Sequence, residues 1–290
     1  MGRFALSGGS QAPRGAAFTD ARMIPNVLSI AGSDPSGGAG VQADLKTFSA
    51  LGCYGMAALT ALTAQNTRGV SAVHVPPASF VAAQIDALFA DVRVDAVKIG
   101  MLATGEIVEA VADRLVAHGA RRIVLDPVLV ATSGDSLGAP DVVEAMKRRL
   151  VPLAHVVTPN MPEAARLTGL AEPATQGELE ALARAVFALG PHAALVKGGH
   201  MGGAHSPDAL ADVSGVRVFS APRIDTRNTH GTGCTLSSAI AARLAQGDDL
   251  VRAVDAAKRY LTGALAASGR LQVGSGEGHG PVHHFHALWS

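Results

Sequence analysis

The stretch VLSIAGSDPSGGAGVQADLKTFSAL, residues 27–51, contains the unit that decides the fold. An apolar run at 27–31 predicts a short strand, a glycine-rich turn follows, and residues 40–51 have the apolar spacing of a helix. The same succession returns several times toward the C-terminus. Strands that are apolar on both faces and alternate with helices are typical of a mostly parallel sheet covered by helices on both sides. The sequence therefore predicts an α/β fold.

The later elements repeat this pattern. Further strands are predicted at 56–62, 70–75, 96–100, 122–126, 155–159 and 193–198. Further helices are predicted at 78–90, 104–118, 140–150, 162–169, 176–189, 233–246 and 249–267. Residues 208–220 predict a hairpin that turns at Ser214 and Gly215.

The composition limits the partners of the protein. Its 290 residues include 24 acidic and 24 basic side chains, so the formal net charge is zero and no basic field is available for nucleic acid. The apolar run at 54–64 has about half the length that a bilayer requires, and it is interpreted as a core strand. We therefore expect a small-molecule partner, with neither nucleic acid nor a membrane.

A single domain is expected over residues 24–290, because α/β folds of this size often share one core. Residues 1–23 show no apolar period and are expected to form a disordered extension, or to precede a true start at Met23. They lack the apolar core of a signal peptide, so the protein is expected in the cytoplasm. In that reducing compartment Cys53 and Cys234 are not expected to pair.

The loops that follow the strands carry the chemistry, since ligands of such sheets collect at the carboxyl ends of the strands. GSDPSGGAG, residues 32–40, fits neither the GxGxxG fingerprint nor a phosphate-binding GK[ST] loop, which disfavours an NAD-dependent oxidoreductase. Its glycines allow either a tight turn or close approach of the backbone to a ligand. Asp44 and Gln65 offer an acceptor beside a donor and acceptor, which suits an aminated heterocycle, although each alone is also typical of a cap or a surface residue.

Two further loops indicate phosphate chemistry. In TPNMPEA, residues 158–164, Asn160 and Glu163 suit either a hydrated Mg²⁺ that carries nucleotide phosphates or a capping box without metal. Lys197 ends an apolar strand, where an ammonium group is costly unless an anion meets it. That placement favours a phosphate partner.

The stretch DTRNTHGTGCTLSSAIAARL, residues 225–244, runs from a glycine turn into a helix. Its unpaired N–H groups and the helix dipole predict an anion site over Gly231, Thr232, Gly233 and Cys234. A thiol there is unexpected, since phosphate transfer suggests a base such as aspartate. Four histidines in the C-terminal tail raise the question of a metal site, but packing and hydrogen bonding of the tail are favoured.

Taken in order, these motifs identify a family. The strings that carry the resemblance, between about Val27 and Trp289, are AGSDPSGGAGVQADLKTFSALGCYG, TAQNTRGV, VKIGML, VLDPV, SGD, TPNMPEA, VKGGH, NTHGTGCTLSSAIAA and GPVHHFHALW. The chain closely resembles the hydroxymethylpyrimidine/phosphomethylpyrimidine kinases of thiamine biosynthesis, in the ribokinase-like superfamily. The resemblance implies a three-layer α/β/α fold with a mostly parallel central sheet, a small flap as lid, and a homodimer.

The resemblance also implies the roles of individual residues. Gly32, Asp44, Gln65 and the backbone around Val128 would hold the aminopyrimidine, and Gly231, Thr232, Gly233 and Cys234 would surround the transferring phosphoryl group. Asn160 and Glu163 would support Mg²⁺, while Lys197 and Lys258 would meet the phosphates of ATP. One departure is Thr132 in the flap, where members often have lysine.

The implied reaction has two steps, in which ATP phosphorylates 4-amino-5-hydroxymethyl-2-methylpyrimidine and then its monophosphate. The first acceptor is an alcohol that loses a proton, whereas the second is already ionised. Because a helix N-terminus lowers the pKa of a thiol, Cys234 is hypothesised to be a compromise base for both steps. The alternative is a small residue with no role in proton transfer.

Two other functions remain open at this point. A pyridoxal kinase of the same superfamily would act on a similar hydroxymethyl heterocycle, although the flap VLVATSGDSL lacks the second cysteine of one such group. A sensor that binds the pyrimidine without turning it over is less consistent with the intact phosphate motifs.

Overall fold

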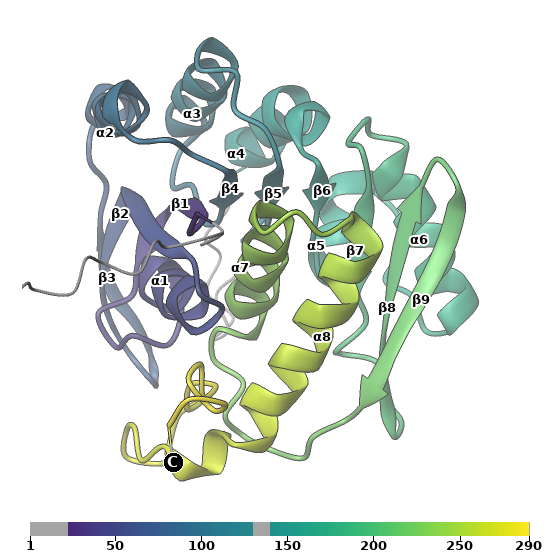
Figure 1. The fold of residues 1–290 in the computed structure, drawn as a ribbon. Helices are drawn as coiled ribbons and strands as arrows, with labels where there is room; N and C mark the ends of the chain where they lie inside the picture. Colours follow the sequence, from purple (N-terminus) through teal and green to yellow (C-terminus); the bar gives the residue numbers. More distant parts are fainter. Residues whose placement is uncertain (1–22, 130–139, 290) are drawn as a thin grey trace, which may run out of the picture.

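The computed structural model describes residues 23–129 and 140–289. Within them, nine strands form one sheet in the order β3-β2-β1-β4-β5-β6-β7-β8-β9 (Figure 1). The strands are β1 (Asn26–Ser33), β2 (Tyr54–Asn66), β3 (Gly69–His74), β4 (Ala96–Ile99), β5 (Ile123–Leu125), β6 (Val156–Val157), β7 (Ala194–Lys197), β8 (His205–Asp212) and β9 (Gly215–Pro222). The strands from β2 to β7 in this order are parallel, while β3 at one edge and β8 and β9 at the other are antiparallel to their neighbours. The predicted mostly parallel α/β fold is confirmed.

Helices cover both faces of the sheet (Figure 1). One face carries α1 (Gly40–Ala50), α7 (Thr232–Ala245) and α8 (Leu250–Ala266), which share an apolar core with the strands. The other face carries α2 (Ala78–Asp91), α3 (Gly105–Ala117), α4 (Pro140–Ala145), α5 (Met161–Thr168) and α6 (Gln176–Phe187), packed in two further apolar clusters. A π-helical turn (Met146–Leu150) continues α4, and 3₁₀ turns occur at Val151–Leu153 and Ser268–Arg270. Burying helix faces against parallel strands leaves the carboxyl ends of those strands open for a ligand.

Local sequence signals explain where several helices begin. Thr104, Thr175 and Asp249 accept a hydrogen bond from the third backbone N–H of α3, α6 and α8 respectively, and so satisfy groups that the helix leaves unpaired. Helix α7 differs, because its N-cap is Gly231, which has no side chain to fill this role. The N–H of Thr232 donates to Thr229 O at 3.3 Å, and the next N–H groups, of Gly233 and Cys234, receive no side-chain cap.

At both edges of the sheet the strands differ in length from the predicted ones. The hairpin of β8 and β9 is longer than predicted, and Gly215 begins its second strand. Strand β2 extends beyond Leu62, its last partner residue for β1, so residues 63–66 pair with β3 alone. This two-stranded ribbon projects past the sheet at the same end as the ligand loops.

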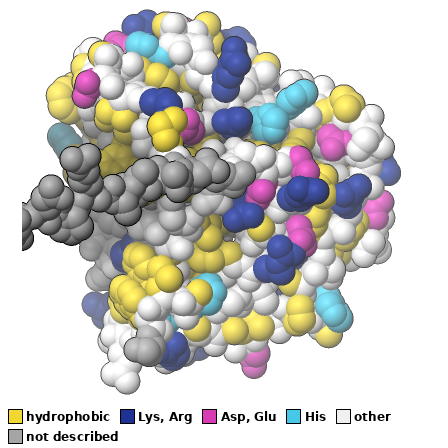
Figure 2. Space-filling model, viewed as in Figure 1, with side chains coloured by type: hydrophobic (Ala, Val, Ile, Leu, Met, Phe, Trp, Pro, Cys, Tyr) yellow, Lys and Arg dark blue, Asp and Glu magenta, His cyan; other side chains and the backbone are white. Residues whose placement is uncertain are grey.

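Several predictions lie outside the described residues. These are the extension at 1–23, apart from Met23, and the part of the flap from residue 130 to 139 that contains Thr132. Among the helices that the structure describes, none has the length and apolar character needed to cross a membrane. Acidic and basic side chains are interspersed over the face shown in Figure 2, as the balanced charge of the sequence predicts.

Candidate active site

A cavity of about 710 Å³ opens at the carboxyl ends of the parallel strands. Strands β1, β5 and β7 contribute its walls through residues at or just after their last positions. All the predicted site residues except Asp44 line this cavity: Gly32, Gln65, Val128, Asn160, Glu163, Lys197, Gly231, Thr232, Gly233, Cys234 and Lys258. Residues that the sequence places more than 200 positions apart thus share one site.

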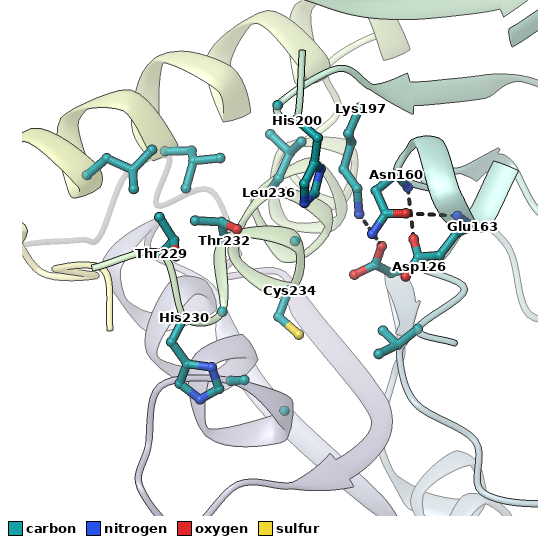
Figure 3. A pocket seen from close by; sticks show the side chains of 18 of the residues that line it. Asp126, Asn160, Glu163, Lys197, His200, Thr229, His230, Thr232, Cys234 and Leu236 are labelled. Atoms are coloured by element: carbon teal, nitrogen blue, oxygen red, sulfur yellow. Dashed lines mark hydrogen bonds and ion pairs between the residues drawn. The ribbon is translucent and has the colours of Figure 1, made fainter. Parts of the chain in front are cut away.

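The start of α7 lies at the centre of the cavity (Figure 3). Gly231 has a left-handed backbone, with φ 78°, and it turns the chain into the helix at Thr232. A Cβ at Gly231 would overlap the carbonyl oxygen of Gly38, so the turn packs directly on the loop at 32–40. Because no side chain caps the N–H groups of Gly233 and Cys234, this turn suits an anion, as the sequence predicts.

The environment of Cys234 corrects one expectation. Burial raises the pKa of its thiol to about 11, although Lys98 and the backbone N–H of Gly40 act in the opposite direction. The expectation of a lowered pKa is therefore wrong, because burial of the thiolate and the nearby carboxylates of Asp44 and Asp126 outweigh the groups that favour it. The thiol is protonated at neutral pH.

An ion pair that the sequence analysis missed lies on one side of this turn. Lys197 Nζ donates to Asp126 Oδ1 at 2.7 Å, and the hydroxyl of Thr158 donates to the same oxygen at 3.1 Å. Burial alone would raise the pKa of Asp126, but Lys197 and Lys98 lower it. Lys197 is thus held by a carboxylate rather than left without an anion. The signal was available, since Asp126 directly follows β5 in a loop already assigned to the ligand end of the sheet.

Asn160 and Glu163 form the capping box that was one of the two interpretations. Asn160 Oδ1 accepts from the backbone N–H of Glu163 at 2.9 Å, and Glu163 Oε2 accepts from the backbone N–H of Asn160 at 2.8 Å (Figure 3). Burial raises the pKa of Glu163 to about 7, against the opposing effect of Lys197.

The side chains around Asn160 and Glu163 suit a weakly bound metal ion better than a site in which protein ligands surround the ion completely. In the described residues no three histidine, cysteine or acidic side chains are grouped to hold a metal ion. Asp126 and Glu163 nevertheless line the cavity together, with the amide of Asn160 beside them. Mg²⁺ commonly takes one or two carboxylates and completes its shell with water and phosphate oxygens. The site therefore fits Mg²⁺ only in the company of phosphates.

Asp44 does not lie in the cavity wall. Its carboxylate is fully buried and accepts from Lys98 Nζ at 2.9 Å, from Ser29 Oγ at 2.6 Å and from Ser238 Oγ at 2.7 Å. Lys98, which the sequence analysis did not select, lines the cavity. The structure therefore connects Asp44 to the site through Lys98, and direct contact of Asp44 with a substrate stays a prediction.

Lys258, on α8, also lines the cavity. Its ammonium group is buried and donates to Asp208 Oδ2 at 2.5 Å. Asp208 lies on β8, and the antiparallel edge of the sheet thereby enters the site. Nothing in the sequence pattern of the hairpin distinguishes Asp208 from a solvent-exposed residue.

The C-terminal tail packs beside the anion turn. The backbone N–H of His230 donates to Gly280 O at 3.0 Å, and His284 Nε2 lies 3.2 Å from the hydroxyl of Thr235. Burial lowers the pKa of His284 to about 3, so this imidazole is neutral. The tail therefore contributes packing and hydrogen bonds, as expected.

Comparisons with known proteins agree with this geometry. The family model for phosphomethylpyrimidine kinase matches residues 34–283. The hydroxymethylpyrimidine/phosphomethylpyrimidine kinase of Salmonella typhimurium is 54% identical over 91% of this chain and 98% of its own length. The enzyme of the same name from Rhizobium meliloti is 56% identical over 92% of this chain and 99% of its own length.

A solved structure extends the likeness to the fold. The pyridoxal kinase from Staphylococcus aureus, in complex with AMP-PCP and pyridoxal, aligns with a TM-score of 0.83 and 33% identity, over 92% of this chain and 96% of that one. The resemblance stated from the motifs is confirmed along almost the whole described chain. This chain therefore belongs to the phosphomethylpyrimidine kinase family.

Proposed function

We propose that this protein transfers the γ-phosphoryl group of ATP to 4-amino-5-hydroxymethyl-2-methylpyrimidine and then to the resulting monophosphate, as a step in thiamine biosynthesis. The relatives that cover nearly all of the chain carry the names of both activities. The observation that carries the proposal is the uncapped turn at Gly231–Cys234, which faces a cavity with lysines on one side and an amide-lined recess on the other.

The nucleotide would occupy the side of the cavity next to α8. Lys197 and Lys258 line this side, and each is already oriented by a buried carboxylate. Leu236, Leu261 and Leu265 add an apolar wall that suits a purine ring. A related pyridoxal kinase binds the ATP analogue AMP-PCP, which supports ATP as the donor.

Mg²⁺ would be held near Asp126, Glu163 and Asn160. When bound, it would neutralise charge on the nucleotide phosphates. The protein residues position the phosphates, and Lys197 and Lys258 supply fixed positive charge that needs no reorganisation during transfer.

The acceptor would occupy the other side, between the loop at 32–40 and the ribbon of β2 and β3. Gln65 lines this recess, and its side-chain oxygen lies 3.1 Å from the hydroxyl of Thr63, which also has a shorter contact of 2.8 Å to Ser33 O. Gly32 and the backbone at Val128 line the same cavity. An amide, which both donates and accepts, suits the ring nitrogens and amino group of an aminopyrimidine.

Cys234 would face the acceptor oxygen. In a loose phosphoryl-transfer transition state, the alcohol proton leaves only as the new P–O bond forms, so a strong base is not required. A protonated thiol carries no charge and does not repel the phosphate of the second acceptor. The structure therefore favours the neutral form of Cys234 over an ionised base at the start of both steps.

Pyridoxal is a second candidate acceptor, because the similar Staphylococcus aureus structure holds pyridoxal. An assay of ADP release with the pyrimidine alcohol, its monophosphate and pyridoxal tests these assignments together. The proposal predicts turnover with both pyrimidines and a lower kcat/KM with pyridoxal. A higher kcat/KM for pyridoxal would favour the pyridoxal kinase, and binding without ADP release would favour a sensor.

We also propose that the protein is a homodimer. Leu62, Val73 and Phe80 on β2, β3 and α2 are 43%, 45% and 59% exposed, and β3 is an edge strand of the sheet among the described residues. Burial of such an edge against a second copy would remove both apolar surface and unpaired backbone groups from water. Sedimentation equilibrium at micromolar concentration is expected to give twice the chain mass, and a monomer mass would contradict the proposal.

A further inference from the structure

A buried hydrogen bond joins the two glycine loops of the site. His230 Nε2 lies 2.7 Å from Asp34 Oδ2, and the two side chains are 8% and 4% exposed. The residues are 196 positions apart in the sequence. His230 immediately precedes Gly231, the first residue of the anion turn (Figure 3).

On its own side, Asp34 organises the loop at 32–40. Its Oδ1 accepts from the backbone N–H and the hydroxyl of Ser36, at 2.9 and 2.7 Å, and its Oδ2 accepts from the backbone N–H of Ala39 at 2.8 Å. Burial by itself would raise the pKa of Asp34, but hydrogen bonds from His230 and Ser36 outweigh it and lower the pKa to about 2. The carboxylate is therefore ionised and fully engaged at neutral pH.

On the other side, the imidazole fixes where the anion turn lies. A Cβ at Gly38 would overlap the His230 ring, and a Cβ at Gly231 would overlap Gly38 O, so the two loops touch with no space between them. The backbone N–H of Gly40 faces the sulfur of Cys234 from the loop at 32–40. The relative position of the loops thus decides whether the N–H groups around Cys234 converge.

We propose that Asp34 and His230 are positioning residues, which hold the turn at Gly231–Cys234 in register with the loop at 32–40 for phosphoryl transfer. This inference rests on the proposed function of the turn as the phosphoryl site. The pair acts through the backbone N–H groups of the turn. Since a displacement of about 1 Å in such a site costs on the order of 100-fold in rate, a loosened turn is expected to slow transfer strongly.

Other contacts hold the backbone of His230 in place, so the positioning role of its side chain can be tested separately from folding. The backbone of His230 is anchored independently, because its N–H donates to Gly280 O at 3.0 Å, and Thr235 in the next helical turn contacts His284. Loss of the imidazole therefore leaves the chain path fixed at the tail while freeing the contact to Asp34. We expect the turnover rate to fall by a larger factor than the stability accounts for.

The test uses two substitutions at one position. His230→Ala removes the contact, while His230→Gln keeps an N–H donor that reaches toward Asp34. The matched control is His118→Gln, because His118 forms a 2.6 Å contact with Asp86 in an exposed pair between α3 and α2, outside the cavity. Each variant is assayed for kcat and KM with the pyrimidine alcohol and for binding of ADP, with and without fluoroaluminate as a phosphoryl mimic.

We expect His230→Ala to lower kcat by about 30- to 100-fold with less than about a threefold change in the KM of the pyrimidine. Binding of ADP alone is unchanged, and the added affinity from fluoroaluminate falls by the same factor as kcat. His230→Gln recovers at least a third of the wild-type kcat, and His118→Gln matches the wild type.

Equal kcat and equal fluoroaluminate binding in His230→Ala and the wild type would overturn the inference. So would a His230→Gln variant that is as slow as His230→Ala while both remain folded. Failure of the proposed function has a different signature, because the wild type itself would then release no ADP with either pyrimidine. The fluoroaluminate comparison needs no acceptor and still decides the positioning role in that case.

Discussion

The thiol of Cys234 is where the structure most changes the chemical interpretation. Its raised pKa of about 11 keeps this side chain neutral at neutral pH, so in the proposed reaction an uncharged group would face the acceptor in both phosphorylations. A carboxylate at this position would assist deprotonation of the alcohol but repel an anionic acceptor at close range. We therefore expect the identity of this residue to affect the balance between the two steps.

Cys234→Asp tests that balance. We expect kcat/KM for the monophosphate to fall at least tenfold more than kcat/KM for the alcohol, measured side by side by ADP release. Cys234→Ser, which is neutral and of similar size, serves as the control and is expected to leave the ratio near that of the wild type. If Asp slows the second step no more than the first, charge repulsion does not explain the thiol.

Glu163 gives a stability that depends on pH. Burial raises its folded-state pKa from 4.5 to about 7, so the folded protein binds this proton more tightly than the unfolded chain does. Its contribution is fully present below about pH 4.5 and is lost as the pH rises through about 7. At 1.36 kcal/mol for each pKa unit, the loss is about 3 kcal/mol.

Urea unfolding of Glu163→Gln against the wild type isolates this contribution, since glutamine keeps the oxygen that caps α5 but does not ionise. We expect the free energy of unfolding of the variant to gain about 3 kcal/mol over that of the wild type between pH 4.5 and pH 8. A difference that stays constant over this range would show that Glu163 does not titrate there.

Lys98 and Asp44 form a fully buried pair beneath the site, so each depends on the other. Lys98→Met leaves the Asp44 carboxylate without its counter-charge and is expected to cost about 3–5 kcal/mol of unfolding free energy. In the double variant Asp44→Asn/Lys98→Met the cost is expected to be smaller than in Lys98→Met alone. Additive costs in chemical denaturation would contradict the pairing.

At the scale of elements, helix α7 carries the anion turn at its start, and a glycine in the left-handed conformation flanks each of its ends. Gly231 precedes the helix with φ 78°, and Gly247 follows it with φ 95°. Only at Gly231 would a Cβ meet another part of the chain, whereas at Gly247 nothing lies within 4 Å. The two positions thus share a backbone conformation and differ in their surroundings.

Alanine at these two glycines separates backbone strain from packing. Gly247→Ala is expected to cost about 1–2 kcal/mol of stability with activity unchanged. Gly231→Ala is expected to lower kcat at least 100-fold, because the turn must move away from Gly38. The comparison uses thermal unfolding and ADP release, and equal activity of the two variants would contradict the close contact of the loops.

The parts of the fold that the sequence predicted are those with local signals. Capping residues, glycine turns and apolar runs marked nearly every strand and helix, and the strings of the family identified the loops at the carboxyl ends of the strands. The capping box of Asn160 and Glu163 was likewise visible in the spacing of its residues.

Side chains that meet across the fold were not predictable in the same way. Asp34 and His230 pair over 196 positions, and the sequence gives no sign that Asp44 accepts a hydrogen bond from Lys98. The pKa of Cys234 also depends on how deeply the helix start is buried, which no helix-end rule contains. These properties arise only when the sheet and its covering helices exclude water from the site.

At the scale of the whole molecule, the central claim is that one cavity carries out two successive phosphorylations. The parallel strands bring the anion turn, the lysines and the recess near Gln65 to a single opening. Both acceptors share the pyrimidine ring, so we expect the same recess to serve each, with the phosphoryl group approaching from the same side.

The most direct test is a time course of one reaction that contains the purified protein, ATP, Mg²⁺ and the pyrimidine alcohol, followed by ³¹P NMR. The account predicts that the pyrimidine monophosphate appears first and is then converted to the diphosphate, with one ADP formed for each phosphoryl group transferred. A reaction that stops at the monophosphate, or that forms neither product while the protein remains folded, would contradict it.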